Sequence, residues 1–359
     1  MAEMPEPLHA TVPQIYQAYR DGRRKCQANE SEGHRPHLGA SKLGHACERH
    51  LWYNFHWSES EELEGRQIRL FDSGHLAEPR FVEDLRSIGV QVWDSDENGK
   101  QFRISTLGNH VGGSLDGVAL GIPESPKTEH LLEFKTHSEK SFMKLVKEGV
   151  RKSKPMHYAQ MQLYMGHTAL TRALYLAVNK NTDELYAERI EFDKAEFDRL
   201  LARAERVVKS VEPPPRFSND PTCYDCKYCQ YSNLCHGDQV PEVNCRTCAN
   251  ATPELDGKTS EAGGRWSCAL GGESIPLDVQ RTGCGEHRYI PILLEKTARM
   301  VNYRDGAVIY DLGDGQTFAN GDGTMGTFSS AEIRACGGKA ALPAAAEYKK
   351  QFATAKVVG

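Results

Sequence analysis

Leu131-Leu132-Glu133-Phe134-Lys135-Thr136 is an apolar, strand-like segment that carries a carboxylate and an ammonium two residues apart. Successive side chains of a strand leave opposite faces, so Glu133 and Lys135 share one face while Phe134 points the other way into a core. Asp116, in Leu115-Asp116-Gly117, lies near the end of an earlier strand-like stretch, residues 111–120. A hairpin through residues 121–128 would bring Asp116 beside Glu133. The pattern therefore predicts two carboxylates and one lysine at one place on a sheet.

Two carboxylates and a lysine suit the hydrolysis of a phosphodiester bond. Mg²⁺ and Mn²⁺ take oxygen ligands and keep several waters, so Asp116 and Glu133 could hold one such ion and leave room for a phosphate and a nucleophilic water. Lys135 could orient that water or neutralise the charge that builds on phosphorus. Taken singly, such residues are typical of a solvated ion pair or a turn. Their joint occurrence, in this order, favours a nuclease-type site.

The two motifs resemble those of the PD-(D/E)xK nuclease superfamily. Asp116 corresponds to the first acidic motif, with Leu115 in place of the proline, and Glu133-Phe134-Lys135 corresponds to the second. The resemblance implies an α/β fold with a mixed central β-sheet flanked by helices, a restriction-endonuclease-like core. It also implies that Asp116, Glu133 and Lys135 are catalytic, with Mg²⁺ or Mn²⁺ as the cofactor.

Two flanking motifs are similar to those of the RecB-like exonucleases within that superfamily. Gly74-His75-Leu76-Ala77-Glu78 lies upstream, and Gln160 and Tyr164 lie downstream with the spacing Q-x-x-x-Y. The resemblance implies that His75 is a further catalytic metal ligand. It implies also that Gln160 and Tyr164, which share one face of a predicted helix, position DNA near the metal.

Of the eleven cysteines, all but Cys26 and Cys336, which are expected to be buried free thiols, fall in groups that suggest metal in a reducing compartment. Cys226, Cys229 and Cys235 follow the predicted nuclease core, and Cys47 precedes it. This layout resembles the iron-sulfur subgroup of RecB-like nucleases, which includes AddB and the CRISPR-associated exonuclease. The resemblance implies a four-iron four-sulfur cluster held by Cys47, Cys226, Cys229 and Cys235. In the alternative, Cys223 joins the last three to hold a cluster or zinc, and Cys47 is merely buried.

A second group of cysteines predicts a small zinc-binding module. Cys245 and Cys248 form a C-x2-C knuckle, and Cys268 and Cys284 follow on separate loops. His287 lies three residues after Cys284, so either of the two could be the fourth ligand. The alternative is a set of buried free thiols.

The composition predicts three parts: a nuclease domain at residues 1–238, a Cys-rich zinc module at 239–292 and a small β-rich accessory tail at 293–359. Helices are expected at residues 11–29, 41–56, 64–88, 140–148, 155–167 and 193–211. Strands are expected at 90–94, 101–105, 111–120, 131–136, 172–179 and 185–192. A hairpin in the tail should join residues 308–310 to 317–319.

A basic cluster directly precedes the predicted Gln160 helix, although the formal net charge of the chain is −5. Affinity for phosphates depends on where the charges lie, so these side chains are candidates for contact with DNA. A solvated helix face is the ordinary alternative. The cluster consists of Lys144, Lys147, Arg151, Lys152 and Lys154.

The family resemblance implies a deoxyribonuclease, more an exonuclease than an endonuclease, that acts on single-stranded DNA ends in recombination, repair, CRISPR adaptation or phage DNA metabolism. The alternatives are a structure-specific endonuclease and a non-catalytic nucleic-acid-binding protein. The absence of a G-x-x-x-x-G-K-[ST] loop suggests that a helicase or recombination protein would act as partner, and a homo-oligomer is open. Residues 1–25 lack the apolar region of a signal peptide and no apolar run is long enough for a membrane span, so a cytoplasmic location is expected.

Overall fold

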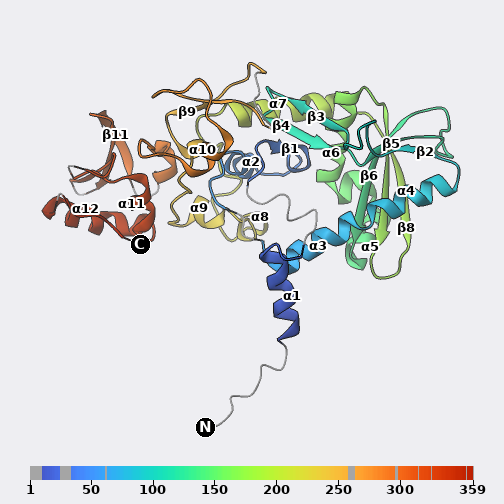
Figure 1. Ribbon diagram of the computed structural model, residues 1–359, viewed down its shortest axis with the longest axis horizontal. Helices are drawn as coiled ribbons and strands as arrows, with labels where there is room; N and C mark the ends of the chain where they lie inside the picture. The colour runs from blue at the N-terminus through green and yellow to red at the C-terminus, as the bar shows by residue number, and fades with distance from the viewer. Residues whose placement is uncertain are drawn as a thin grey trace, which may run out of the picture. The chain divides into compact units, whose positions relative to one another are not determined.

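The computed structural model describes residues 10–24, 34–60, 63–257, 263–295, 298–313, 315–324, 326–352 and 354–358 of the 359-residue chain. The chain divides into two compact units (Figure 1). Unit 1 comprises residues 1–35, 61–104 and 113–200, and unit 2 comprises residues 36–60, 105–112 and 201–359. Each unit is therefore built from segments that are far apart in the sequence. The predicted boundaries at residues 238 and 292 stay predictions.

A five-stranded mixed sheet forms the centre of unit 1 (Figure 1). The strands β6 and β7 run parallel, and every other neighbouring pair in the sheet is antiparallel. With the helices that pack on it, this sheet confirms the predicted mixed α/β fold. In spatial order the strands are β2 (Gln91–Trp93), β5 (Gly117–Leu120), β6 (His130–His137), β7 (Arg172–Asn179) and β8 (Leu185–Glu191).

Helices pack against this sheet in unit 1. One face of the sheet contacts α4 (Glu78–Ser87), where the rings of Phe81 and Phe134 stack with centroids 5.0 Å apart in an apolar cluster. Because side chains alternate along β6, Glu133 and Lys135 leave the opposite face, the one on which α6 packs. The other helices are α1 (Thr11–Arg20), α3 (Gly65–His75), α5 (Glu139–Ser153), α6 (Pro155–Thr168) and α7 (Lys194–Lys209), the last of which continues into unit 2.

The structure differs from the predicted elements at two points that matter for the site. The single strand expected at 111–120 is two strands, β4 (Val111–Ser114) and β5, with Asp116 in the break between them. Gly117 makes the break possible, because its φ is +154° and a Cβ there would lie 2.8 Å from the carbonyl oxygen of Trp93. The helix expected at 64–88 is likewise two helices, α3 and α4, since Pro79 in the first turn of α4 has no backbone N–H to continue the ladder.

Unit 2 consists of short elements. The tail hairpin is confirmed, with Ile309 opposite Ala319 and Tyr310 opposite Phe318. The strand β1 pairs in parallel with Val111 and Gly112, the first residues of β4, and β3 (Arg103–Thr106) runs across the unit boundary. The elements are β1 (Leu38–Gly39), η2 (Ala40–Lys42), α2 (Glu48–Phe55), α8 (Tyr224–Lys227), α9 (Ser232–His236), η3 (Cys245–Thr247), β9 (Ala251–Pro253), β10 (Trp266–Cys268), α10 (Leu277–Thr282), η4 (Pro291–Leu294), β11 (Arg299–Arg304), β12 (Ala307–Gly313), β13 (Gln316–Asn320), α11 (Ser330–Ala335), η5 (Lys339–Ala341) and α12 (Leu342–Gln351).

One buried arginine joins distant parts of unit 2. The guanidinium of Arg246 lies 3.6 Å from the ring centroid of Trp57 and 4.9 Å from that of Trp266. It also donates hydrogen bonds to the backbone carbonyls of Phe55 and Pro36. Burial lowers the pKa of Arg246 well below its ordinary value, so these stacking and carbonyl contacts compensate for the missing water. They hold the segment around α2 against the Cys245–Cys248 knuckle.

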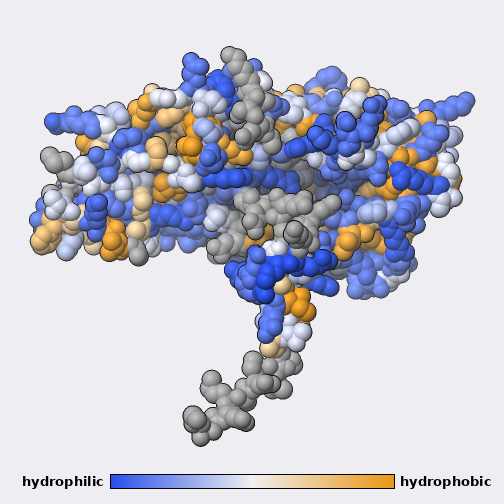
Figure 2. All heavy atoms as spheres, viewed as in Figure 1, coloured by the Kyte–Doolittle hydropathy of each residue, from blue (hydrophilic) through white to orange (hydrophobic). Residues whose placement is uncertain are grey.

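The surface shows no long apolar stretch on the face drawn in Figure 2, where hydrophobic residues are scattered among hydrophilic ones. Of the helices that the structure describes, none combines the length and the apolar character needed to cross a membrane.

Candidate active site

The structure brings the three residues of the predicted catalytic motif together. β5 and β6 pair with Gly117 opposite Leu132, which places Asp116 next to β6. The Oδ2 atom of Asp116 accepts a hydrogen bond of 2.7 Å from the backbone N–H of Phe134. Glu133 is fully buried and forms an ion pair with Lys135, whose side chain is 27% exposed. The antiparallel pairing predicted from the sequence is therefore the contact that assembles the site.

Burial and mutual repulsion perturb the charges of this site. Burial raises the pKa of Glu133 to about 7, and the nearby Asp116 raises it further, while Lys135 acts in the opposite direction. Burial alone would lower the pKa of Lys135, but the carboxylates of Glu133 and Asp116 more than offset it, so that this pKa is raised. Lys135 therefore stays an ammonium. Its single positive charge does not neutralise both the Asp116 and the Glu133 carboxylates.

Glu78 is a further acidic residue of the site that the sequence analysis did not assign. It is the first residue of α4, and burial together with the charge of Asp116 raises its pKa to about 7. The signal was present in the sequence, because Glu78 ends the quoted motif that contains His75. His75 itself ends α3, and its Nδ1 atom is buried without a hydrogen-bond partner. Within the described part of the chain, no hydrogen bond or ion pair joins His75 to the carboxylates, and its role as a ligand stays a prediction.

The acidic side chains fit a divalent cation in chemistry, although they are not arranged as a finished metal centre. Among the residues that the structure describes, no three His, Cys, Asp or Glu side chains are placed to hold a metal ion. However, Oε1 of Glu133 is paired only with the Lys135 ammonium, and Oε2 is buried without a hydrogen-bond partner. A buried carboxylate oxygen without a partner is costly, and a bound cation would compensate it. Asp116, Glu133 and Glu78 supply the hard oxygen ligands that Mg²⁺ and Mn²⁺ prefer.

The raised pKa values predict a pH-dependent response to Mg²⁺. Because the folded-state pKa of Glu133 and of Glu78 is about 7 against an ordinary value of 4.5, their stabilising contribution is complete below about pH 4.5 and is lost as the pH rises through 7. A bound cation removes this penalty, so Mg²⁺ should raise the melting temperature more at about pH 8 than at about pH 5. Thermal unfolding with Mg²⁺ or with EDTA measures this. An equal effect of Mg²⁺ at both pH values would contradict the assignment of the carboxylates.

Gln160 and Tyr164 lie beside the site but are buried. They are 7% and 2% exposed, and Nε2 of Gln160 donates a hydrogen bond of 3.3 Å to the hydroxyl of Tyr164. Burial, followed by the charge of Glu133, raises the pKa of Tyr164. A Cβ at Gly113 would lie 2.5 Å from the hydroxyl oxygen of Tyr164, so the close approach of this ring to β4 requires glycine there. Contact of both side chains with DNA stays a prediction. It would require the DNA strand to reach these two buried side chains.

The predicted basic cluster is mainly a surface feature. Two of its side chains are already paired, Lys144 at 4.0 Å from Glu148 and Arg151 at 3.5 Å from Asp193. Lys154 differs from the others, because it is partly buried and its ammonium donates to the hydroxyl of Ser141. The exposed members are Lys144, Lys147, Arg151 and Lys152.

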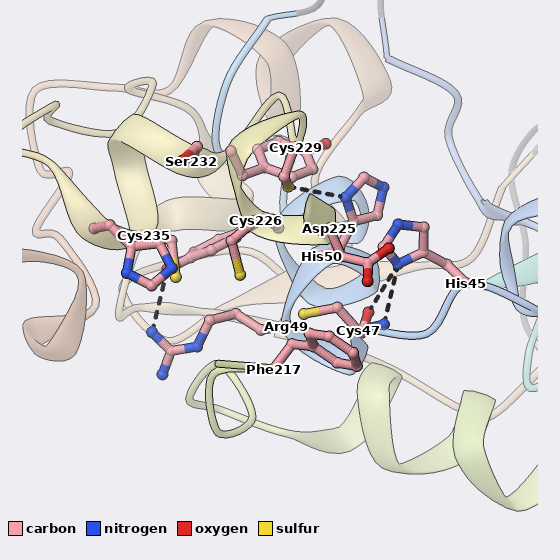
Figure 3. A pocket seen from close by; sticks show the side chains of 13 residues that line it. His45, Cys47, Arg49, His50, Phe217, Asp225, Cys226, Cys229, Ser232 and Cys235 are labelled. Carbon is pink, nitrogen blue, oxygen red and sulfur yellow. Dashed lines mark hydrogen bonds between the residues drawn. The ribbon is translucent and has the colours of Figure 1, made fainter. Parts of the chain in front are cut away.

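The four cysteines predicted to hold an iron-sulfur cluster line one pocket of unit 2 (Figure 3). In the close-up, the sulfur atoms of Cys47 and Cys226 are turned into the same space, and Cys235 lies beside them. Nδ1 of His50 lies 3.4 Å from the Sγ atom of Cys229. Burial raises the pKa of Cys229, and Cys47 and Cys235 raise it further, which indicates that these thiols are close. The cysteines of the described residues are free thiols.

Cys223 is not among the residues that line this pocket. It lies instead next to Cys226, whose pKa is raised to about 11 by burial and by a hydrogen bond with Cys223. Cys47 shares the pocket and Cys223 contacts Cys226 from outside its lining, so the choice between the two ligand sets stays a prediction. The described thiols are nevertheless not arranged as a finished metal centre.

The four cysteines predicted to bind zinc line a second pocket of unit 2, together with His287. Burial raises the pKa of Cys245 to about 12, and Cys248, Cys284 and Cys268 raise it further, so the four thiols are neighbours. Nε2 of His287 lies 3.1 Å from the hydroxyl of Thr247, and its Nδ1 atom is buried without a partner. Cys284 is exposed. Both candidates for the fourth ligand are therefore at the pocket, and its described side chains are not yet arranged around an ion.

Comparison with known proteins gives a match to a family model. The model described as the PD-(D/E)XK nuclease superfamily matches residues 8–236. No curated protein matches the chain. Among solved structures, the alkaline exonuclease LHK-Exo from Laribacter hongkongensis is similar at 18% sequence identity and a TM-score of 0.36, with 48% of this chain and 87% of that chain covered. A protein designated SSO0001 is similar at 15% identity and a TM-score of 0.38, with 63% of this chain and 96% of that chain covered.

Proposed function

Because the chain belongs to the PD-(D/E)XK nuclease superfamily, we propose that it is a metal-dependent deoxyribonuclease that hydrolyses phosphodiester bonds from single-stranded DNA ends. The observation that carries the proposal is the convergence of Asp116, Glu133 and Lys135 at the paired strands β5 and β6. A solvated ion pair, the ordinary alternative, does not account for a fully buried Glu133.

Mg²⁺ or Mn²⁺ would be held by the carboxylates of Asp116 and Glu133, with Glu78 and the predicted ligand His75 as further donors. Such an ion supplies an activated water and neutralises charge on the phosphate. The chain contributes the placement of these groups. The backbone N–H of Phe134 holds the Asp116 carboxylate against β6, so that the two motifs keep their spacing.

Lys135 is held in an orientation that leaves donor capacity for substrate. Its ammonium has three N–H donors, of which one reaches the carbonyl oxygen of Phe134 at 3.0 Å and another faces the carboxylate of Glu133. The remaining N–H can orient the attacking water or donate to a phosphate oxygen. Such a preorganised donor stabilises the charge that develops in the transition state.

An iron-sulfur cluster on Cys47, Cys226, Cys229 and Cys235 is part of the proposal. The shared pocket of the four thiols supports it, and the position of Cys223 outside that lining favours the set that contains Cys47. A four-iron four-sulfur cluster takes four thiolates. Because Cys47 and Cys226 are far apart in the sequence, the cluster would close a long loop and stabilise unit 2.

A structural zinc ion on Cys245, Cys248, Cys268 and Cys284 is the second metal proposal. The pocket that these residues share supports it. His287 is the alternative to Cys284, because the hydroxyl of Thr247 donates to the carbonyl of Glu242 and can accept the Nε2–H of His287. Nδ1 of that ring would then keep a free lone pair.

We place the activity in recombination, repair, CRISPR adaptation or phage DNA metabolism as a hypothesis from the family resemblance. A helicase or recombination partner would supply unwinding. The basic residues of α5 are the proposed phosphate contacts, because the exposed ammonium groups of Lys147 and Lys152 have no ion pair within the described residues.

Cleavage of linear and circular single-stranded DNA tests the proposed activity. Anaerobically purified protein with Mg²⁺ or Mn²⁺ is expected to degrade end-labelled linear DNA and to spare circles, because an exonuclease needs a free end. Products sampled over time give the direction of degradation. Nicked circles would replace the exonuclease with an endonuclease, and no cleavage of any substrate would contradict the catalytic proposal.

A further inference from the structure

A chain of hydrogen-bonding side chains continues from the catalytic face of β6. His137 lies two residues beyond Lys135, so its side chain leaves the same face of the strand. Its Nε2 atom lies 2.8 Å from the hydroxyl of Tyr175, and Nδ1 of His157 lies 2.9 Å from the same hydroxyl. The ring centroids of His137 and His157 are 6.0 Å apart, with an angle of 22° between the ring planes. No motif in the sequence analysis included these residues.

This series of hydrogen-bonded side chains lies beside the proposed catalytic residues. Tyr175 on β7 is the register partner of Glu133 on β6, and the charge of Glu133 contributes to raising the pKa of Tyr175 after burial. The ring of His157, on the first turn of α6, is in the field of Lys135. Because Tyr175 pairs with Glu133 and is hydrogen-bonded to His157, His157 lies close to the Glu133–Lys135 pair.

The direction of the chain follows from counting protons. The ammonium of Lys154 can only donate, and it donates to the hydroxyl oxygen of Ser141. Ser141 lies 3.3 Å from Nδ1 of His137, which offers the serine proton its acceptor. Nε2 of His137 then carries the hydrogen and donates to Tyr175. Because the hydroxyl of Tyr175 has a single proton, it donates that proton to Nδ1 of His157, and the hydrogen of His157 is on Nε2.

The opposite direction is less favourable. It would put a hydrogen on Nδ1 of both histidines, and the hydroxyl of Ser141 would accept from Lys154 and from His137 at once. The serine proton would then have no acceptor among the hydrogen bonds of the described residues. Burial, together with the charge of Lys135, lowers the pKa of His157 to about 3, so the ring is neutral and only one nitrogen carries a hydrogen. The donor at the Lys154 end of the series therefore determines which nitrogen of His157 carries the hydrogen.

We propose that the Nε2–H of His157 donates a hydrogen bond to a phosphate oxygen of the DNA strand beside Lys135, in the tautomer that Lys154, Ser141, His137 and Tyr175 impose. This phosphate subsite rests on the proposed nuclease function. Nε2 of the partly exposed His157 has no partner within the described structure, so the donor is available to substrate. A phosphate oxygen is the acceptor that the proposed reaction brings to Lys135.

Binding of short single-stranded DNA to a Glu133→Gln background, without cleavage, tests the subsite. Adding His157→Ala is expected to weaken binding by about 10- to 100-fold, the effect of losing a hydrogen bond to a charged group. The slope of log affinity against log salt should stay unchanged, because the lost donor is neutral, whereas loss of a cationic phosphate contact lowers the slope by about 1. Unchanged affinity, or a slope reduced by about 1, would overturn the proposal that His157 is a neutral donor to the phosphate.

Two amide replacements separate phosphate contact from a purely structural role. His157→Gln can place an amide N–H near the position of Nε2 and should keep affinity within about fivefold of the Glu133→Gln background, a small part of the hydrogen-bond contribution. His157→Asn places its amide near Nδ1 and should bind as weakly as His157→Ala. Better rescue by asparagine would overturn the proposal, because it would show that only the bond to Tyr175 matters.

Tyr175→Phe tests the imposed tautomer in the cleaving protein. Loss of the hydroxyl frees the His157 ring to carry its hydrogen on either nitrogen, so KM should rise by about 3- to 10-fold with a smaller change in kcat. His167→Gln, a change of a histidine later on α6 that packs against Phe197, is the matched control and should match wild type. If wild-type protein neither binds nor cleaves DNA, the proposed function fails; if it does both and the His157 and Tyr175 variants match it, only the subsite fails.

Discussion

Replacing Glu133 with glutamine is expected to lower the rate of DNA cleavage by about 10³-fold or more, while the protein stays folded. The carboxylate is fully buried, burial raises its pKa to about 7, and its Oε2 atom has no hydrogen-bond partner. Glutamine has the same shape but removes the negative charge that a divalent cation requires. Losing one preorganised charge at a reacting phosphate costs on the order of 10²- to 10³-fold, and losing a metal ligand adds to that. Initial rates with Mn²⁺ and Mg²⁺ on end-labelled linear DNA measure the effect.

Lys135→Ala should lower the rate of cleavage to a similar extent, because it removes the ammonium that pairs with Glu133 and that we propose as the donor to the phosphate. Glu97→Gln and Lys100→Ala are the matched controls, since both side chains are exposed in the turn after β2. They should retain wild-type rates. Thermal unfolding of every variant excludes loss of the fold as the cause. Rates for Glu133→Gln and Lys135→Ala within about tenfold of wild type, against the losses expected for such charges, would sink the catalytic assignment.

Replacing Cys47 with serine is expected to remove the visible absorption of an iron-sulfur cluster and to destabilise unit 2. The cluster would join Cys47 to Cys226, Cys229 and Cys235 across a long loop of the chain. Losing a crosslink over a loop of this length should lower the free energy of unfolding by about 4 kcal/mol or more. Iron and sulfide analysis, the visible spectrum and chemical unfolding of anaerobically purified protein measure the two effects.

Cys223→Ser discriminates between the two ligand sets, because Cys223 lies outside the lining of the pocket. It should keep both the spectrum and the stability of wild type, as should Cys336→Ser. Cys245→Ser should lose zinc and keep the spectrum, which separates the two metal centres. If Cys223→Ser removed the visible absorption and Cys47→Ser did not, the ligands would instead be Cys223, Cys226, Cys229 and Cys235.

Local patterns were sufficient for the parts of the site that depend on one element. The alternation of Glu133 and Lys135 along β6 follows from the two-residue period of a strand, and the spacing of Gln160 and Tyr164 follows from the helix period. The hairpin that carries Asp116 to Glu133 was predictable because consecutive strands tend to pair. The same alternation along β6 places His137 on the face of Glu133 and Lys135, although His137 is not part of any motif.

The sequence patterns could not predict contacts between different helices and strands. The approach of Glu78 to Asp116 depends on how α4 packs, and the break at Asp116 depends on the carbonyl of Trp93 against Gly117. The burial of Tyr164 depends on its packing against Gly113. A sequence period states which face a side chain takes, but it does not state what covers that face.

By itself, the sequence determined the mixed α/β fold, the predicted catalytic motif and the local cysteine clusters, because each of these follows from residue type and spacing along the chain. Only the tertiary structure decided that Cys47, and not Cys223, shares the pocket with Cys226, and that His137 and His157 meet at Tyr175. Those choices depend on packing between segments far apart in the chain. Many sequences with the same local periods could pack differently, so the arrangement is set by the sum of contacts and not by any one pattern.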